Sequence, residues 1–232
     1  MNTLKKFFES ILDFIYPPIC LLCGERTEGD RQICPDCWDK FLDTLKLNFQ
    51  KYKKDFHHLT GEIFFDEMVT CWTYTSEIEK LIHRVKYQRG KKLAILLGRT
   101  AGKNLQQVFK GWDDTLIIPV PLHRVRQRER GYNQSELLCQ GLAAHIPVPI
   151  SSDLLFRHRN TPSQTKLTAQ ERHENVKDAF TIRQPDRLAG KKIILVDDVS
   201  TTGATMNSCA SCLKKAGAEK VIGIALARPQ FE

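Results

Sequence analysis

The spacing of apolar residues predicts an amphipathic helix at the start of the chain. Along residues 1–16, apolar side chains recur three and four positions apart, which is the stripe of one helix face. The stripe consists of Leu4, Phe7, Phe8, Ile11, Leu12 and Ile15. Two interpretations stay open, a helix packed on its own protein and a helix lying on a membrane surface. The first is favoured because the polar face is not especially basic.

The same segment argues against export. Glu9 and Asp13 interrupt any signal-peptide core, and no small-residue cleavage site follows. No stretch of the sequence approaches the roughly 18 apolar residues that a membrane span needs. The sequence therefore predicts a soluble, cytoplasmic protein with reduced thiols and no membrane span.

Farther along the chain, short apolar runs alternate with helical patterns. Strands are predicted at residues 67–74, 115–120, 154–157, 193–196 and 220–227. Helices are predicted at residues 35–48, 76–86, 91–109, 133–145, 168–176 and 205–216. This alternation indicates a doubly wound, mostly parallel α/β sheet with helices on both faces, in which ligands bind beyond the carboxyl ends of the strands.

A polar connector at residues 51–58 divides the predicted elements into two domains. We expect a small N-terminal domain over residues 1–55 and a larger α/β domain over residues 60–232. Charge adds a preference for anionic partners, because 35 Lys and Arg against 27 Asp and Glu leave a net charge of +8. Nucleic acids and phosphorylated metabolites are the partners that such a balance favours.

The most informative segment is IILVDDVSTTGAT, residues 193–205, where a buried strand ends in two carboxylates and a run of small residues opens a helix. Asp197 and Asp198 can accept hydrogen bonds from vicinal hydroxyls or attract Mg²⁺ through water. The following residues lie where backbone N–H groups and the positive end of a helix dipole form an anion site. These predicted phosphate-binding residues are Ser200, Thr201, Thr202, Gly203, Ala204 and Thr205.

Two other interpretations explain this segment less well. The GxxxxGK pattern of nucleotide triphosphatases is absent. An Asp-capped helix after a core strand would account for one carboxylate and not for the rest. The whole string resembles the phosphoribosyl pyrophosphate (PRPP) signature of type I phosphoribosyltransferases. That resemblance implies that Asp197 and Asp198 are the catalytic pair holding the ribose 2′ and 3′ hydroxyls, and that the loop holds the 5′-phosphate.

Two basic segments are candidates for pyrophosphate or nucleic-acid contacts. Pro119, Val120 and Pro121 end the strand at residues 115–120, and four arginines follow within seven residues, at Arg124, Arg126, Arg128 and Arg130. Guanidinium groups bind phosphate in a bidentate manner, although such a run can also be a solvated face. The second segment includes Arg157, Arg159 and Lys166. Its length and its proline indicate a mobile loop over the site, with an ordinary surface loop as the alternative.

A third feature is the cysteine array C-x2-C-x10-C-x2-C, formed by Cys20, Cys23, Cys34 and Cys37. Two such pairs complete a tetrahedral thiolate site that selects Zn²⁺ in a structural role. Two disulfides and an iron–sulfur cluster are the less favoured alternatives. Cys71, Cys139, Cys209 and Cys212 are interpreted as packing residues, and His57 and His58 as exposed connector residues.

Taken in order, PVPLHRVRQRERGYNQ, RHRNTPSQTKLTAQERHENVKDAF and VDDVSTTGAT resemble the ComF family of DNA-uptake proteins. The resemblance covers residues 71–228 and the cysteine region. It implies a type I phosphoribosyltransferase fold with a zinc-ribbon-like domain, a pyrophosphate loop at 119–121, and a flexible loop at 157–166. It also implies a role in natural competence with a ComFA-type helicase.

Three functions follow from these observations. The first is a DNA-uptake accessory protein that binds single-stranded DNA or the helicase and carries a site for PRPP or ribose 5-phosphate. The second is an active phosphoribosyltransferase acting on an unidentified base or amine, although no residue that would recognise a base is evident in the sequence. The third is a scaffold whose sugar-phosphate site is vestigial.

Overall fold

The computed structural model describes residues 18–29, 31–50, 56, 59, 62–88, 90–159, 176 and 178–229. Four predictions lie outside the described residues: the helix at residues 1–16, nearly all of the helix at 168–176, the place of Lys166 in a loop, and the exposure of His57 and His58.

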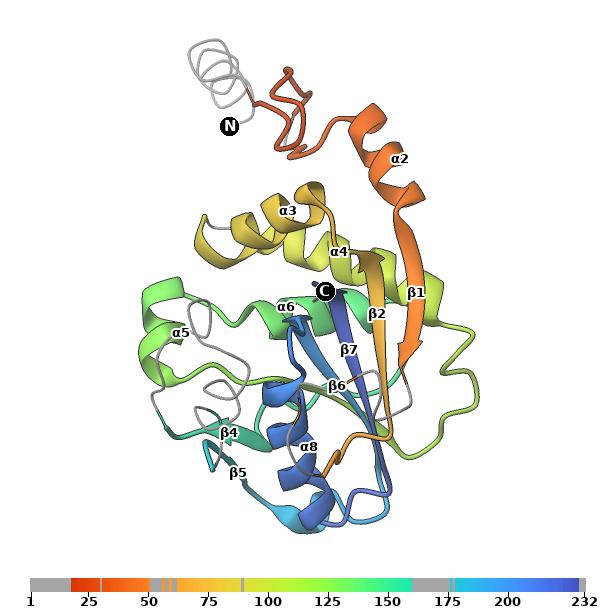
Figure 1. The fold of residues 1–232 in the computed structure, drawn as a ribbon, viewed down its shortest axis with the longest axis vertical. Helices are drawn as coiled ribbons and strands as arrows, with labels where there is room; N and C mark the ends of the chain where they lie inside the picture. The colour runs from red at the N-terminus through yellow and green to blue at the C-terminus, as the bar shows by residue number, and fades with distance from the viewer. Residues whose placement is uncertain are drawn as a thin grey trace, which may run out of the picture.

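A central sheet of five strands organises the described chain, in the order β1-β2-β7-β6-β3 (Figure 1). The strands are β1 (Leu45–Gln50), β2 (Glu67–Thr73), β3 (Thr115–Pro119), β6 (Lys192–Val199) and β7 (Lys220–Arg228). Strands β2, β7, β6 and β3 are parallel to one another, and β1 at the edge pairs antiparallel with β2. The predicted mostly parallel sheet is therefore confirmed, and four strands bring their carboxyl ends to one edge.

Helices cover both faces of this sheet. Along β6, Ile194 and Val196 belong to one apolar core, and Ile193 and Leu195 belong to another. The first core is completed by α3 (Ser76–Tyr87), α4 (Lys91–Leu105) and α6 (Gln134–Leu142), and the second by α8 (Ala204–Lys215). Because successive side chains of a strand point to opposite faces, this division is the signature of a doubly wound fold.

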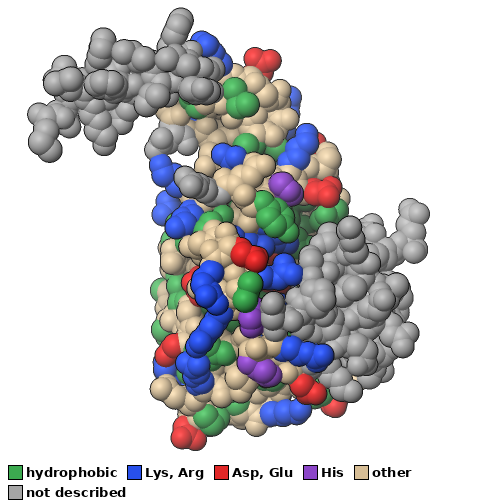
Figure 2. Space-filling model, turned by 90° about the vertical axis from the view of Figure 1, so that its left-hand side faces the viewer, with side chains coloured by type: hydrophobic (Ala, Val, Ile, Leu, Met, Phe, Trp, Pro, Cys, Tyr) green, Lys and Arg blue, Asp and Glu red, His purple; other side chains and the backbone are tan. Residues whose placement is uncertain are grey.

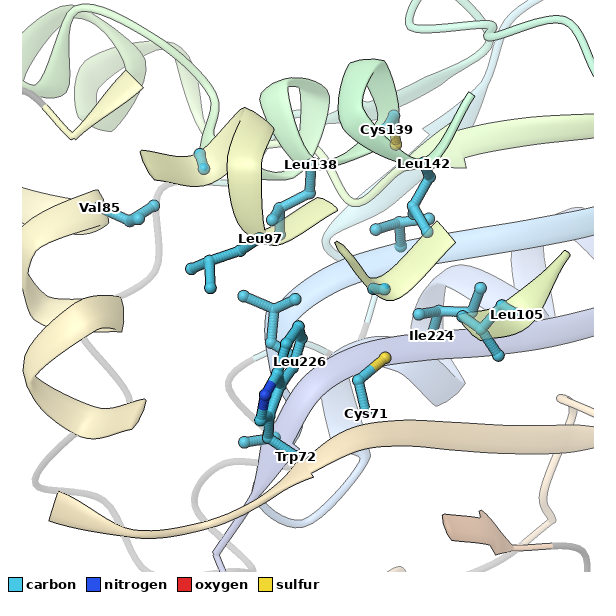
Figure 3. Packing of buried hydrophobic residues seen from close by; sticks show 14 of the residues in the cluster. Cys71, Trp72, Val85, Leu97, Leu105, Leu138, Cys139, Leu142, Ile224 and Leu226 are labelled. Carbon is cyan, nitrogen blue, oxygen red and sulfur yellow. The ribbon is translucent and has the colours of Figure 1, made fainter. Parts of the chain in front are cut away.

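The first core is built around Trp72, which is almost completely buried. Figure 3 shows Leu97 of α4 and Leu138 of α6 packed over Trp72 and Leu226 of the sheet. Cys71 and Cys139 lie fully buried in the same core. Cys209 is fully buried in the second core, and Cys212 packs partly buried against it. The four cysteines outside the array are thus packing residues, as predicted.

Two predicted elements are wrong in part. The helix predicted at residues 35–48 ends at Asp43 as α2 (Pro35–Asp43), because Thr44 closes it by donating its Oγ1 and N–H hydrogens to Phe41 O. The alternating residues that follow form β1 against β2, so the sheet reaches back into the segment assigned to the small domain. The division near residues 55–60 stays a prediction.

The strand predicted at residues 154–157 is confirmed as a strand, but it does not belong to the central sheet. It forms β4 (Leu155–Arg157), which pairs antiparallel with β5 (Phe180–Ile182) in a separate two-stranded sheet. Its three residues give too short an apolar run for periodicity alone to assign it to the central sheet.

Among the described residues, no helix combines the length and apolarity needed to cross a bilayer.

Helices α4 and α6 touch through backbone atoms. A Cβ built on Gly98 of α4 would lie 2.3 Å from Leu138 O, and one on Gly141 of α6 would lie 2.3 Å from Ile95 O. Real side chains do not approach a carbonyl so closely, so these positions admit only glycine without a shift of one helix. The contact sets how α6 lies on the sheet.

We therefore predict that Gly98→Ala destabilises the protein by about 1 to 3 kcal/mol through overpacking. In a helix without such a contact the same change would stabilise by about 1 kcal/mol, so the sign of the effect is diagnostic. Urea unfolding followed by circular dichroism measures it. Arg99→Ala, at the neighbouring exposed position, is the control and should change stability by less than about 0.5 kcal/mol. A Gly98→Ala protein as stable as the parent would contradict the close contact.

Candidate functional site

The carboxyl ends of the parallel strands open into a cavity of about 350 Å³. Its walls come from the end of β2, from α3, from the segment after β3, and from the end of β6 with the loop that follows. Among the predicted site residues, the cavity is lined by Val120, Pro121, Arg126, Arg130, Arg157, Asp197, Asp198, Thr201 and Thr205. Segments far apart in the sequence thus meet at one sheet edge, as expected for a doubly wound fold.

Asp197 and Asp198 lie near the end of β6 and are held by side chains of two helices. The Oδ1 atom of Asp197 accepts a hydrogen bond from Ser135 Oγ of α6 at 3.0 Å. The Oδ2 atom of Asp198 lies 3.1 Å from Lys86 Nζ of α3, and the Asp198 side chain is only 4% exposed. The pair is therefore fixed in place by side chains from both neighbouring helices.

Burial governs the charge on this pair. Burial raises the pKa of Asp197 to about 7, with the neighbouring charge of Asp198 as the next cause, while Lys86 opposes the shift. Burial would lower the pKa of Lys86, but the attraction of Asp198 and then of Asp197 outweighs it, so the net shift is upward. Near neutral pH the site therefore holds a charged lysine beside a carboxyl group that is close to its midpoint of titration.

Lys86 was not among the predicted site residues. Helix α3 begins at the cap Thr75, and its buried stripe is Ile78, Leu81, Ile82 and Val85. Lys86 follows Ile82 by one turn, so it sits at the border of that stripe. A lysine at the border of a buried face was the available signal, and it is a weak one because long basic side chains often cover apolar surface there.

The loop between β6 and α8 has the predicted form. Gly203 adopts a φ of +87°, which favours glycine, and α8 begins at the next residue. A second, smaller hollow of about 30 Å³ is lined by Asp197, Val199, Ser200, Thr201, Gly203, Ala204, Thr205 and Met206. Arg228 at the end of β7 donates from Nε to Thr201 O at 3.1 Å and so fixes the loop.

Thr202 differs from its neighbours in this loop. It is 2% exposed, and its Oγ1 accepts a hydrogen bond from the Ala204 N–H at 3.3 Å. It lines neither hollow, so its hydroxyl shapes the turn instead of facing a ligand. Ser200 is also buried, and its Oγ has no hydrogen-bond partner among the described residues.

The arginine segment forms a helix that the sequence did not suggest, α5 (Arg124–Arg130). His123 caps it by accepting the Val125 N–H at its Nδ1 atom, and Gly131 ends it with a φ of +77°. On a helix, residues four apart share a face. The four predicted arginines are therefore divided into two pairs.

Arg126 and Arg130 are half-buried and line the cavity, whereas Arg124 and Arg128 are exposed and line a separate shallow depression. Of the later basic residues, Arg157 lines the cavity and Arg159 is exposed outside it. Before the helix, Pro119 ends β3, and the Val120 N–H donates to Val196 O at 2.8 Å. These contacts keep the predicted pyrophosphate loop beside β6.

The four array cysteines come together in the N-terminal part of the described chain. Their sulfur atoms all lie within 4.8 Å of one another, and Cys23 Sγ is 3.8 Å from Cys34 Sγ. A tetrahedral zinc ion with Zn–S bonds of about 2.3 Å needs sulfurs about 3.8 Å apart, whereas a disulfide needs about 2.05 Å. Gly24, at a φ of +82°, allows the turn behind the first pair. The donor set therefore fits zinc and does not fit two disulfides.

The pKa of the Cys37 thiol also indicates that a cation is needed for all four cysteines to ionise. A hydrogen bond with Cys34, then burial, then Cys23 and Cys20 raise the pKa of Cys37 to about 12. The other thiols thus oppose ionisation of the last one. A bound dication removes that opposition by accepting all four sulfurs as thiolates.

Comparison with known families matches two parts of the chain. Residues 133–230 match the phosphoribosyl transferase domain, and residues 11–46 match the double zinc ribbon domain. The predicted phosphoribosyltransferase-type α/β domain and the N-terminal cysteine ribbon are therefore confirmed.

Solved structures with a related arrangement include glutamine PRPP amidotransferase from B. subtilis and a hypoxanthine phosphoribosyltransferase from Staphylococcus aureus. The first is 19% identical, covers 62% of this chain and 30% of its own, and has a TM-score of 0.42. The second is 10% identical, covers 61% and 76% of the two chains, and has a TM-score of 0.35. These likenesses are too weak to carry an argument about the site.

Sequence relatives are closer. Competence protein F of Haemophilus influenzae is 32% identical over 91% of this chain and 85% of its own length. DNA utilization protein YhgH of Escherichia coli strain K12 is 31% identical over 88% and 87%. Competence protein ComFC of Bacillus subtilis is 26% identical over 86% and 72%. With such relatives across nearly its whole length, and with a cysteine ribbon joined to a phosphoribosyltransferase-type domain, this chain belongs to the ComF family.

Proposed function

We propose that this chain is a DNA-uptake accessory protein with two binding functions. Its cavity binds PRPP or ribose 5-phosphate, and its basic face binds single-stranded DNA, a ComFA-type helicase, or both. The observation that carries the first part is the position of Asp197, which lines both the cavity with Asp198 and the smaller hollow with Gly203. The names of its relatives, which refer to competence and DNA utilization, support the second part.

The sugar is held by the acidic pair in this proposal. Two vicinal hydroxyls donate hydrogen bonds to carboxylate oxygens of Asp197 and Asp198. Hydrogen bonds to an ionised carboxylate are strong because the acceptor is charged. The 5′-phosphate enters the hollow at the start of α8, where Thr201 and Thr205 add hydroxyl donors and the helix dipole favours an anion. A pyrophosphate group at the other end of the sugar would meet Arg126, Arg130 and Arg157.

Mg²⁺ fits the same place only with a ligand present. Asp197 and Asp198 are the residues that would hold it through water, and the ion would neutralise pyrophosphate oxygens. Lys86 already supplies one positive charge to the pair, 3.1 Å from Asp198. In this proposal, lysine and arginine side chains of the protein neutralise the remaining negative charge of the carboxylates and of the ligand's phosphate groups.

Transfer of the phosphoribosyl group from PRPP to a base or amine is the second candidate function. The cavity favours it in one respect, because residues of α3 that the sugar phosphate does not use also line it and are available to an acceptor. A scaffold with a vestigial site is the third, and it predicts no ligand-dependent heat at all.

The basic face supports nucleic-acid binding. Figure 2 shows Lys and Arg side chains along the face that carries α5. Arg124 and Arg128 lie there outside the cavity, so they are available to a phosphate backbone when a sugar phosphate fills the site. A structural zinc ion held by four thiolates completes the proposal, and it suits the reducing cytoplasm predicted for the protein.

Ribose 5-phosphate should bind more tightly as the pH rises from 6 to 8. Asp197, with a pKa of about 7, is protonated at the acidic end of this range and ionised at the basic end. The ionised carboxylate accepts a sugar hydroxyl more strongly than the protonated carboxyl group does, so affinity should increase severalfold. Isothermal titration calorimetry at three pH values measures the change.

The matched control is Asp197→Asn, which keeps the shape of the side chain. The ligand's own phosphate also titrates near pH 6, and that contribution remains in the variant. The pH dependence specific to the protein should therefore disappear, and Asp197→Asn/Asp198→Asn should bind at least tenfold more weakly. Equal affinities in the parent and the double variant would contradict the proposed site.

Arg124→Gln/Arg128→Gln should weaken binding of a single-stranded oligonucleotide and leave the affinity for ribose 5-phosphate unchanged. Each lost phosphate contact reduces the slope of log affinity against log salt by about 0.7, so the double variant should lower it by about 1.4. Fluorescence anisotropy over a salt series gives the slope. Lys103→Gln/Lys110→Gln removes the same charge at exposed positions in and after α4 and should keep the parent slope. An unchanged slope in the arginine variant would exclude α5 from the DNA interface.

The purified protein should carry about one zinc ion per chain, and a chelator should release it with a loss of thermal stability. Elemental analysis and a melting curve measure the two effects. Cys34→Ser should lack the metal, whereas Cys212→Ser, outside the array, should retain it. Iron in place of zinc, or zinc retained by Cys34→Ser, would overturn the assignment.

A further inference from the structure

One wall of the cavity has a chemistry that the sugar-phosphate proposal does not use. It is formed by α3 and the residue after β2, and most of its side chains are aromatic or apolar. The wall consists of Tyr74, Glu79, Ile82, His83 and Tyr87. Tyr87 is the last residue of α3, and 61% of it is exposed although it lines the cavity. This wall offers a planar surface beside a site for an anionic sugar.

The ring of Tyr87 is held in position by two neighbours. His83, one turn earlier on α3, has its ring centroid 4.9 Å away at an interplanar angle of 47°. The Arg130 guanidinium of α5 lies over the ring, 5.4 Å from its centroid, and its Nη1 donates to Gln134 Oε1. A ring fixed in this way loses little conformational freedom when a ligand stacks on it.

The end of α3 is also anchored at the two residues before the tyrosine. The preceding residue, Lys86, pairs with Asp198 at 3.1 Å. One residue earlier, Val85 O accepts a hydrogen bond from the hydroxyl of Tyr132. The last turn of α3 is therefore tied to the acidic pair and to the segment just before α6. These contacts hold the part of the helix that carries the tyrosine beside the acidic pair.

The simplest alternative is that His83 and Tyr87 are an ordinary pair four residues apart that stabilises an exposed helix. That alternative explains the His83 contact only. It does not explain why the arginine that lines the sugar-phosphate cavity also lies over the same ring. An aromatic face combined with a guanidinium is a surface on which a nucleobase stacks, with a cation–π contribution from the arginine.

We propose that the α3 wall is a nucleobase subsite, with Tyr87 as its stacking surface and Arg130 as the link to the sugar-phosphate site. The inference deepens the proposed function and rests on it, because the subsite adjoins the acidic pair. The base has two possible sources. One is a base that accompanies the sugar at the acidic pair, and the other is a base of a DNA strand that runs along α5.

Two pairs of probes isolate the contribution of the base. The ratio of the affinities for adenosine 5′-monophosphate and ribose 5-phosphate measures the contribution of a base attached to the sugar. The ratio of the affinities for an oligothymidine 15-mer and an abasic 15-mer of equal phosphate charge measures the contribution of the bases of DNA. Stacking on one aromatic residue contributes about 5- to 100-fold in affinity. We expect the parent protein to show a ratio in this range for at least one pair.

Tyr87→Ala should reduce that ratio to about one, and Tyr87→Phe should restore it because the ring remains. Tyr87→Ala should leave the affinity for ribose 5-phosphate itself unchanged, which a general folding defect would not do. If the ratio for the monophosphate pair depends on Tyr87, the base on the sugar is the source. If the ratio for the oligonucleotide pair depends on Tyr87, the source is a base of DNA. Ratios equal in the parent and in Tyr87→Ala for both pairs would overturn the subsite.

These outcomes also separate the subsite from the function on which it rests. If ribose 5-phosphate fails to bind but the oligonucleotide ratio depends on Tyr87, the sugar-phosphate proposal is wrong and the base subsite stands. If ribose 5-phosphate binds through Asp197 and neither ratio exceeds one in the parent, the sugar-phosphate proposal stands and the base subsite is wrong.

Discussion

The candidate site depends on the ion pair between Lys86 and Asp198. Burying an unpaired carboxylate costs several kcal/mol, and two carboxylates at adjacent positions repel each other as well. Lys86 Nζ, 3.1 Å from Asp198 Oδ2, offsets this cost at one carboxylate. At the other, Ser135 donates a hydrogen bond, and the pKa of Asp197 rises to about 7. The site is therefore a balance of charges whose partners come from α3 and α6.

That balance explains why the helix packing matters to the chemistry. Ser135 is positioned by α6, whose cap Asn133 also donates from Nδ2 to Val120 O at the end of β3. The contact of α6 with α4 through Gly98 and Gly141 fixes its distance from the rest of the core. A shift of α6 would move Ser135 away from Asp197. The glycines in the core thus contribute to the geometry of a site that they do not touch.

The arrangement of arginines has a similar origin. In the sequence the four arginines form one dense run, and nothing there distinguishes one arginine from another. Folding that run into α5 places Arg126 and Arg130 in the cavity and leaves Arg124 and Arg128 outside it. One short helix therefore presents two basic surfaces, one inside the cavity and one outside it. This division is the observation on which we propose a sugar-phosphate site and a separate DNA interface in one protein.

The sequence by itself determined the features whose causes are local. Apolar periodicity gave most strands and helices of the sheet, the cysteine spacing gave the metal ligands, and the strand ending in two carboxylates gave the loop at α8. Only the tertiary structure decided that β1 is a strand. The alternating apolar and polar residues after Asp43 become a strand because β2 is there to pair with them. The tertiary structure alone showed the contacts of Lys86 and Tyr87, which look like an ordinary surface pair at the end of α3. Their partners are Asp198 of β6 and Arg130 of α5, and contacts between residues so far apart in the chain leave no local pattern.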